Sequence, residues 1–165
     1  MKDFVKDGQK LPLYGIGPYF VFVMAAVTIA GIILFCCVLK IGILAGPWKL
    51  IFRIAAGILI ALGILIWFTG ALRSDMDNNI AENKLKTDGV YAWVRNPMYS
   101  GLWILITGIS LMWHNAWLLI VPFINWGIMT ITLEYTEEKW LLDLYGAAYT
   151  EYKERVNRCI PWRRG

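Results

Sequence analysis

The sequence has few of the residues from which most metal and thiol sites are built. Its 165 residues include one histidine and three cysteines. Cys36 and Cys37 are adjacent and Cys159 stands far from both, so there is neither a zinc-ligand spacing nor a pair placed to form a disulfide. We therefore expect no metal site, and we interpret His114, the single histidine, as a turn residue.

Signatures of soluble nucleotide-binding enzymes and of serine hydrolases are also missing. The sequence contains no P-loop, no G-x-G-x-x-G and no G-x-S-x-G, which excludes a soluble nucleotide-binding sheet as the platform for a cofactor. The net charge of +4 comes from basic residues spread over loops and the tail, without a basic stripe interleaved with aromatic residues. We therefore expect no nucleic-acid binding.

Hydrophobic residues dominate what is present. They make up 58% of the chain, which also has nine tryptophans, and this is too apolar for a soluble domain of this length. A membrane-spanning helix needs about 20 apolar residues. The sequence predicts an all-α integral membrane protein, one membrane domain over residues 1–165, with amphipathic cytosolic helices at its C-terminal end. The four expected transmembrane helices are residues 18–39, 54–72, 98–113 and 116–133.

Small residues and breaks refine this expectation. Three glycines in the second span, Gly57, Gly63 and Gly70, are expected to let a neighbouring helix approach closely. After the fourth span, Gly146 allows a helix break. Beyond it, a helix over residues 149–156 would carry Glu151 with Arg155, and Glu154 with Arg158, as ion pairs four residues apart.

Positive residues are unevenly divided between the two sides of the predicted bundle. With four spans, the N-terminus, residues 73–95 and the C-terminal tail share one side, and that side holds every lysine and arginine except Lys40, Lys49 and Arg53. The bias predicts that both termini are cytoplasmic. Anionic membrane lipids are the expected partners of the exposed basic residues.

Residues 89–101, GVYAWVRNPMYSG, lie at the border between a charged stretch and an apolar run. Pro97 favours a helix start at its own position and disfavours helix at Asn96. The unpaired N–H groups of that helix would lie at the membrane edge with Arg95, the Asn96 amide and two tyrosines. This combination can hold a polar, partly anionic ligand beside lipid. The polar residues 73–95 are interpreted either as a solvated loop or as a lid over such a pocket.

Three glutamates follow the fourth span, and we expect them on the same side of the membrane as Arg95. Glu134, Glu137 and Glu138 have the i, i+3, i+4 spacing of one helix face. They can pair with Arg95 structurally, or they can leave carboxylate oxygens for a ligand. A carboxylate can bind ribose hydroxyls or an ammonium group, and an arginine can bind a carboxylate through two hydrogen bonds. S-adenosylmethionine carries all of these groups.

These residues carry a family resemblance. GVYAWVRNPMYSG, followed by EEKWLLDLYGAAYTEYKERV, resembles the isoprenylcysteine carboxyl methyltransferase family, to which the phospholipid methyltransferases are related. The resemblance covers about residues 83–161 and implies a membrane-embedded, S-adenosylmethionine-dependent methyltransferase with a cytosolic cofactor pocket. The residues that would bind the cofactor by resemblance are Asn83, Lys84, Leu85, Lys86, Tyr91, Asn96, Pro97, Met98, Tyr99 and Glu137.

The resemblance also implies catalytic residues. Glu137 matches a family glutamate at the active site and Glu138 its neighbour, which would serve as general base if the acceptor is an amine. Arg95 would orient an anionic acceptor or the carboxylate of the cofactor. Two positions depart from the family pattern: Asn96 replaces the usual histidine before the proline, and Leu133 stands where prenylcysteine enzymes have an arginine.

The expected acceptor is a lipophilic small molecule or a lipidated group, either a prenylcysteine-like carboxylate or a lipid headgroup, entering sideways from the bilayer. Two other functions agree with the sequence. One is a non-catalytic lipid-binding or scaffold protein in the membrane, and the other is a membrane reductase that uses a nicotinamide cofactor. The sequence sets neither the acceptor nor the oligomeric state.

Overall fold

The computed structural model describes residues 17–72 and 85–161. Within these ranges the chain forms helices joined by turns, with two isolated β-bridges and no strand, so the expected all-α fold is confirmed. The elements are α1 (Gly17–Ile32), η1 (Ile33–Val38), α2 (Pro47–Leu72), η2 (Gly89–Ala92), α4 (Pro97–Met112), η3 (Ala116–Ile120), α5 (Val121–Tyr135), α6 (Glu137–Tyr145) and α7 (Ala147–Arg155).

Three helical segments of the described chain are long and apolar enough to cross a membrane: Gly17–Val38, Pro47–Ala71 and Ala116–Tyr145. The apolar helix Pro97–Met112 is shorter. The second of these segments begins at Pro47 instead of the predicted residue 54, because proline fits the first position of a helix, where its missing N–H is not needed.

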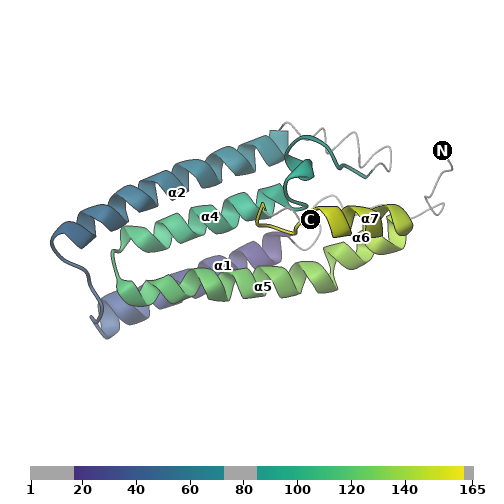
Figure 1. Ribbon diagram of the computed structural model, residues 1–165. Coiled ribbons are helices and arrows are strands. Elements are labelled where there is room, and N and C mark those ends of the chain that lie inside the picture. The colour runs from purple at the N-terminus through teal and green to yellow at the C-terminus, as the bar shows by residue number, and fades with distance from the viewer. Residues whose placement is uncertain (1–16, 73–84, 162–165) are drawn as a thin grey trace.

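The four long helices run side by side, and α6 and α7 lie together at one end of the bundle (Figure 1). We call this the site end: α1 and α4 begin there, and α2 and α5 finish there. The opposite end, the turn end, holds the connections between α1 and α2 and between α4 and α5. Two segments far apart in sequence, the start of α4 and the region after α5, therefore share the site end.

Helices α2 and α4 are in backbone contact through glycines. A Cβ atom on Gly63 would lie 2.7 Å from the carbonyl oxygen of Gly101, and a Cβ on Gly101 would lie 2.7 Å from the carbonyl oxygen of Gly63. A Cβ on Gly70 would lie 3.1 Å from Met98 and 3.4 Å from Pro97, the first two residues of α4. The expected role of Gly63 and Gly70 is confirmed. That of Gly57 is wrong, because no described atom lies within 4 Å of a Cβ placed there.

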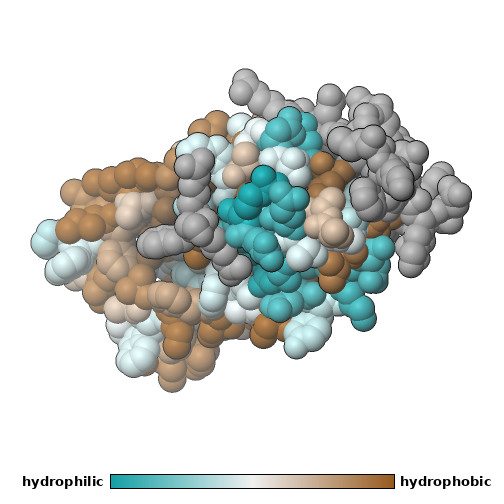
Figure 2. All heavy atoms as spheres, turned by 45° about the vertical axis from the view of Figure 1, so that its right-hand side comes forward, coloured by the Kyte–Doolittle hydropathy of each residue, from teal (hydrophilic) through white to brown (hydrophobic). Residues whose placement is uncertain are grey.

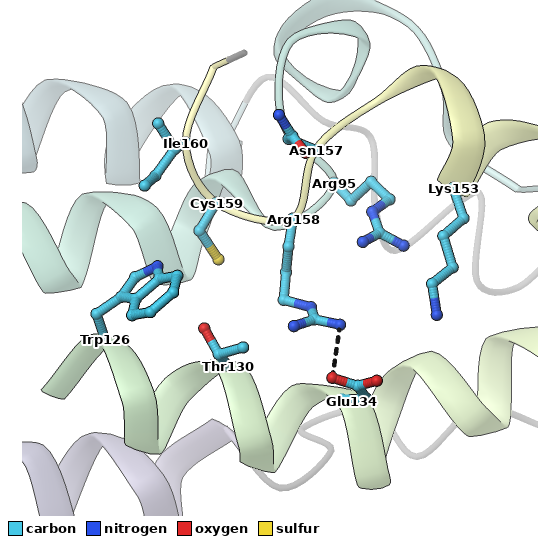
Figure 3. A pocket seen from close by; sticks show the side chains of 9 residues that line it. All are labelled: Arg95, Trp126, Thr130, Glu134, Lys153, Asn157, Arg158, Cys159 and Ile160. Carbon is cyan, nitrogen blue, oxygen red and sulfur yellow. Dashed lines mark hydrogen bonds and ion pairs between the residues drawn. The ribbon is translucent and has the colours of Figure 1, made fainter. Parts of the chain in front are cut away.

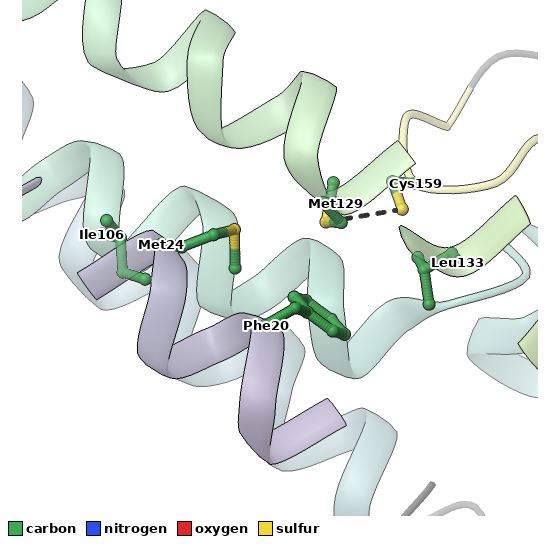
Figure 4. Packing of buried hydrophobic residues seen from close by; sticks show 6 residues of the cluster. All are labelled: Phe20, Met24, Ile106, Met129, Leu133 and Cys159. Carbon is green, nitrogen blue, oxygen red and sulfur yellow. Dashed lines mark hydrogen bonds between the residues drawn. The ribbon is translucent and has the colours of Figure 1, made fainter. Parts of the chain in front are cut away.

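The largest core cluster joins α1, α4 and α5 to the C-terminal segment. It consists of Phe20, Met24, Ile106, Met129, Leu133 and Cys159 (Figure 4). The Cys159 sulfur lies 3.8 Å from the sulfur of Met129, so residues that follow α7 are packed back into the bundle. Leu133 is fully buried here. The residue that departs from the family pattern at this position therefore packs in the core.

The turn end is held by one buried asparagine. Asn115 donates a hydrogen bond from Nδ2 to the carbonyl oxygen of Ile41, at 2.7 Å, and accepts one from the backbone N–H of Trp117, at 2.9 Å. Its neighbour His114 has a φ of +39° in the connection after α4. The interpretation of His114 as a turn residue is confirmed.

Candidate functional site

The start of α4 is fixed by the C-terminal segment. Pro97 is the first residue of α4, and the carbonyl oxygen of Asn96 accepts hydrogen bonds from the backbone N–H and Oγ of Ser100, at 3.0 and 2.8 Å. The N–H groups of Arg95 and Asn96 donate to the carbonyl oxygens of Asn157 and Arg158, at 2.8 and 3.0 Å. The turn before α4 and the residues after α7 therefore form one backbone-paired unit.

A break in the chain separates the three glutamates. Helix α5 ends at Tyr135 and α6 begins at Glu137, because Thr136 has a non-helical conformation with φ −123° and ψ −86°. Glu134 therefore belongs to α5, whereas Glu137 and Glu138 occupy the first turn of α6, where a helix dipole favours acidic residues. The expectation that all three share one helix face is wrong for Glu137, which contacts Tyr99, whereas Glu134 and Glu138 both contact Arg158.

Glu138 is buried and surrounded by cations. Its Oε1 lies 3.1 Å from Nη2 of Arg95 and accepts a short hydrogen bond from Nε of Arg158, while its Oε2 lies 3.1 Å from Nζ of Lys153. The Glu138 and Arg95 side chains are 3% and 5% exposed. Opposite charges compensate one another at such depth. Structural pairing, one of the two alternatives left open by the sequence, therefore holds for Glu138.

Arg95 is held from a second direction by Tyr149 of α7. Its Nη1 donates to the Tyr149 hydroxyl at 3.4 Å, and its guanidinium carbon lies 6.0 Å from the centre of the ring. Burial raises the pKa of Tyr149, so the phenol stays neutral. The Nε of Arg95 is buried and has no hydrogen-bond partner among the residues that the structure describes, which leaves a donor for a ligand.

Glu137 faces away from this cluster, towards α4 and α1. The hydroxyl of Tyr99 donates to Oε1 of Glu137 at 2.5 Å, as expected for a hydrogen bond to a charged acceptor. The Tyr99 ring packs edge-on against Phe20 at 4.7 Å between centroids. The start of α4 and the start of α6 are thus joined twice, through Tyr99 with Glu137 and through Arg95 with Glu138.

Other candidate cofactor residues approach α7. Leu85 packs against a buried cluster that includes Tyr145 and Tyr152. Tyr91 is buried, and its carbonyl oxygen accepts a hydrogen bond from the Tyr152 hydroxyl at 2.6 Å. Lys86 forms an ion pair with Asp88 at 3.1 Å. The stretch before α4 is therefore docked on the last two helices.

Of the remaining candidate cofactor residues, two pack against α2 and one has a buried polar group. Pro97 and Met98 approach Gly70 of α2. Nδ2 of Asn96 is buried and has no hydrogen-bond partner in the described part of the chain. Asn83 and Lys84 lie outside the described residues.

Four residues of the site were not singled out from the sequence: Tyr149, Lys153, Asn157 and Arg158. The expected pair of Glu154 with Arg158 is wrong because α7 ends at Arg155, which removes the helical spacing. The pair of Glu151 with Arg155 is confirmed at 3.6 Å.

A pocket of about 500 Å³ opens between α5 and the C-terminal segment (Figure 3). It is lined by Arg95, Trp126, Thr130, Glu134, Lys153, Asn157, Arg158, Cys159 and Ile160. Figure 2 shows the most hydrophilic residues gathered at the site end and hydrophobic residues over much of the remaining described surface in view. The site therefore lies at the border between the polar site end and the apolar part of the helical bundle.

Comparison with known proteins identifies relatives of this chain. Residues 50–148 match the family model described as phospholipid methyltransferase. The chain is 32% identical over 81 residues to protein-S-isoprenylcysteine O-methyltransferase of Schizosaccharomyces pombe and 35% identical over 81 residues to protein-S-isoprenylcysteine O-methyltransferase B of Arabidopsis thaliana. It is also 35% identical over 81 residues to methanethiol S-methyltransferase 1 of Bradyrhizobium diazoefficiens. No solved structure gives a significant match.

These matches cover 48%, 48% and 49% of this chain but only 34%, 41% and 27% of the respective relatives. The chain therefore aligns with less than half of each relative's length. The resemblance to isoprenylcysteine methyltransferases expected from the sequence is confirmed by these relatives. Because the family model covers more than half of the chain, from α2 to the start of α7, this protein belongs to the phospholipid methyltransferase family.

Proposed function

We propose that this chain is a membrane-embedded, S-adenosylmethionine-dependent methyltransferase that acts on a lipophilic acceptor. The observation that carries the proposal is the double link between the start of α4 and the start of α6. Tyr99 contacts Glu137 at 2.5 Å and Arg95 contacts Glu138 at 3.1 Å. The relatives of the chain include O- and S-methyltransferases, which supports the reaction type.

The polar groups of the site fit the chemistry of this cofactor. Nδ2 of Asn96 and Nε of Arg95 are buried donors without a partner among the described residues, and such groups are costly unless a ligand or water satisfies them. Glu137, which accepts a hydrogen bond from Tyr99, is the carboxylate that would contact ribose hydroxyls or an ammonium group of the cofactor. When bound, S-adenosylmethionine supplies a methyl group that its sulfonium already activates.

The residues of this chain would contribute position more than acid or base chemistry. Tyr99 fixes the orientation of Glu137, and Glu138 fixes Arg95, because both oxygens of Glu138 contact cations. We therefore assign Glu138 the holding of Arg95 in place of general-base catalysis. An acceptor that is already anionic needs no base, and holding the reactants in line is a large part of such catalysis.

Calorimetry on the detergent-solubilised protein tests the proposal. We expect S-adenosylhomocysteine to bind with micromolar affinity. We expect Glu137→Gln and Tyr99→Phe to weaken that binding about tenfold or more, because a hydrogen bond to a charged group contributes about 1.5–3 kcal/mol. Tyr135→Phe is the matched control, since Tyr135 is 75% exposed and outside the site.

Other results would overturn the proposal. Binding of NADPH without S-adenosylhomocysteine would indicate a reductase. Binding of neither, by protein that elutes as a single folded species, would indicate a lipid-binding or scaffold protein.

A further inference from the structure

Helices α5 and α6 are separated by a single non-helical residue. Thr136 has φ −123° and ψ −86°, whereas Tyr135 before it belongs to α5 and Glu137 after it belongs to α6. A junction of one residue between two rigid helices can change their relative direction, as hinges in proteins do. Glu137 contacts Tyr99 of α4 from the first turn of α6. The position of this candidate site residue therefore depends on the angle between α5 and α6.

The side chain of Arg158 contacts carboxylates on both sides of this junction. Its Nη2 lies 3.3 Å from Oε2 of Glu134, in the last turn of α5 (Figure 3). The same nitrogen donates to Oε2 of Glu138, in the first turn of α6, at 3.0 Å, and Nε donates a second, short hydrogen bond to Oε1 of Glu138. A guanidinium can hold two carboxylates at once because its donors are fixed in one plane, which the single nitrogen of a lysine cannot reproduce.

The two ends of this bridge differ in burial. The Glu138 side chain is 3% exposed and the Arg158 side chain 16%, whereas that of Glu134 is 54% exposed. The buried end holds the guanidinium in place. An exposed ion pair contributes little to stability by itself, so the contact with Glu134 acts on the direction of α6 more than on the free energy of unfolding.

The backbone of Arg158 is itself fixed. Its carbonyl oxygen accepts a hydrogen bond from the N–H of Asn96 at 3.0 Å, and the carbonyl oxygen of Asn157 accepts one from the N–H of Arg95 at 2.8 Å. The next residue, Cys159, is buried in the core cluster of Figure 4. Arg158 is therefore joined to the turn before α4 through its main chain and to the α5–α6 junction through its side chain.

We propose that Arg158 is a positioning residue that fixes the angle between α5 and α6 and thereby holds Glu137 against the start of α4. It acts through Glu137 and has no need to touch the cofactor or the acceptor. Its consequence for cofactor binding rests on the proposed function. Its consequence for the helix angle does not.

Distances between two spin labels, measured by double electron–electron resonance without any cofactor, test the helix angle. Ile124→Cys on α5 and Leu142→Cys on α6 replace side chains that are 44% and 45% exposed. The two positions would be about 27 Å apart if the helices were collinear, which is within the range of the method. The parent chain for labelling lacks Cys36 and Cys37 and keeps Cys159, which is buried.

Two variants break the bridge at different points. Arg158→Lys keeps a positive charge beside Glu138, and Glu134→Gln leaves the contacts of Glu138 in place, so we expect both proteins to fold. Each should shift or broaden the distance distribution relative to the parent chain. An unchanged distribution in either variant would overturn the proposal.

Matched controls come from an exposed ion pair on α7. Arg155 and Glu151 contact each other at 3.6 Å with side chains that are 66% and 70% exposed. Arg155→Lys and Glu151→Gln make the same chemical changes there, and we expect both to reproduce the distance distribution of the parent chain. Shifts as large as those of the bridge variants would show a general effect of surface charge and contradict the role of Arg158.

A double-mutant cycle on the binding of S-adenosylhomocysteine tests whether Arg158 acts through Glu137. We expect Arg158→Lys to weaken binding about tenfold in the otherwise unchanged chain. In a chain that already carries Glu137→Gln it should cause no further loss, because the effects of residues that act as a unit are not additive. Equal losses in both chains, which a merely structural role would produce, would overturn the action through Glu137.

The two measurements keep this proposal distinct from the proposed function. A parent chain that binds no S-adenosylhomocysteine would contradict the methyltransferase, while the spin-label distances would still decide whether Arg158 sets the helix angle. Binding of S-adenosylhomocysteine with distances unchanged by the bridge variants would support the methyltransferase and overturn the positioning role.

Discussion

At the residue scale, Glu138 is the most constrained charge in the described chain. It is 3% exposed and contacts two arginines and a lysine that come from the turn before α4, from α7 and from the segment after α7. The hydrogen bond with Glu138 also raises the pKa of Arg158, so this partner stays cationic. One side chain therefore joins three parts of the chain that the sequence separates.

Loss of the Glu138 charge should destabilise the protein. Glu138→Gln leaves Arg95 and Lys153 without an ionised partner among the described residues and leaves Arg158 with Glu134 alone, and removal of one member of a buried pair costs about 3–5 kcal/mol. We expect a clearly lower midpoint of thermal unfolding in detergent. Size-exclusion chromatography of heated samples measures this midpoint. Glu151→Gln is the control, because it removes the same charge from an exposed pair with Arg155. An equal midpoint for the two variants would contradict the central role of Glu138.

Some of these residues were predictable and others were not. Arg95 and the glutamates stand out because charges beside an apolar run are few and the bundle must return them to one side. Arg158 does not, because its spacing from Glu154 looks helical until α7 stops at Arg155. Which partner a cation takes depends on the end of that helix, and helix ends are the least determined feature of a sequence.

At the element scale, α2 is attached to the bundle mainly through α4. The contact is close because Gly63 and Gly101 oppose each other, with each missing side chain replaced by the backbone of the other helix. Sequence alone identified the glycines of α2 as a candidate contact, but it could not say which of them face α4. The answer depends on the rotation of α2 about its axis. The sequence does not determine this rotation, because α2 is apolar on all its faces.

A pair of alanine substitutions in α2 tests this contact. A Cβ on Gly63 would lie 2.6 Å from the backbone nitrogen of Leu105, so Gly63→Ala forces the helices apart and should cost about 1–3 kcal/mol, as overpacking does. Gly57→Ala makes the same change on the same helix where the described residues leave open space. We expect the thermal midpoint to fall for Gly63→Ala alone. Parallel losses would show that α2 does not pack on α4 in this register.

At the scale of the whole molecule, the short α4 explains the depth of the site. Its 16 residues span about 24 Å, less than the roughly 30 Å hydrocarbon core of a bilayer. A helix of this length cannot reach both polar surfaces, so the turn at Asn96 and Pro97 is expected below the headgroups. Arg95 and Glu138 form an ion pair there, because charges near lipid must be paired.

We expect the site end of the bundle to face the cytoplasm. Cations of the described site end include Lys86, Lys139, Lys153 and Arg155, against Lys40, Lys49 and Arg53 at the turn end, so the positive-inside bias places the site end and both termini in the cytoplasm. The test uses single cysteines introduced by Lys49→Cys at the turn end and by Glu151→Cys at the site end, in a chain that lacks Cys36 and Cys37.

Cys159 can remain in this chain, because burial raises its pKa to about 12 and its thiol stays protonated and unreactive at pH 8. A membrane-impermeant maleimide should label Lys49→Cys in intact cells and Glu151→Cys only after permeabilisation. The parent chain with Cys159 alone should stay unlabelled in both conditions, which also checks the burial of the C-terminal segment against Met129. Labelling of Glu151→Cys in intact cells would show that the orientation is opposite to the one predicted, with the site on the outer face of the membrane.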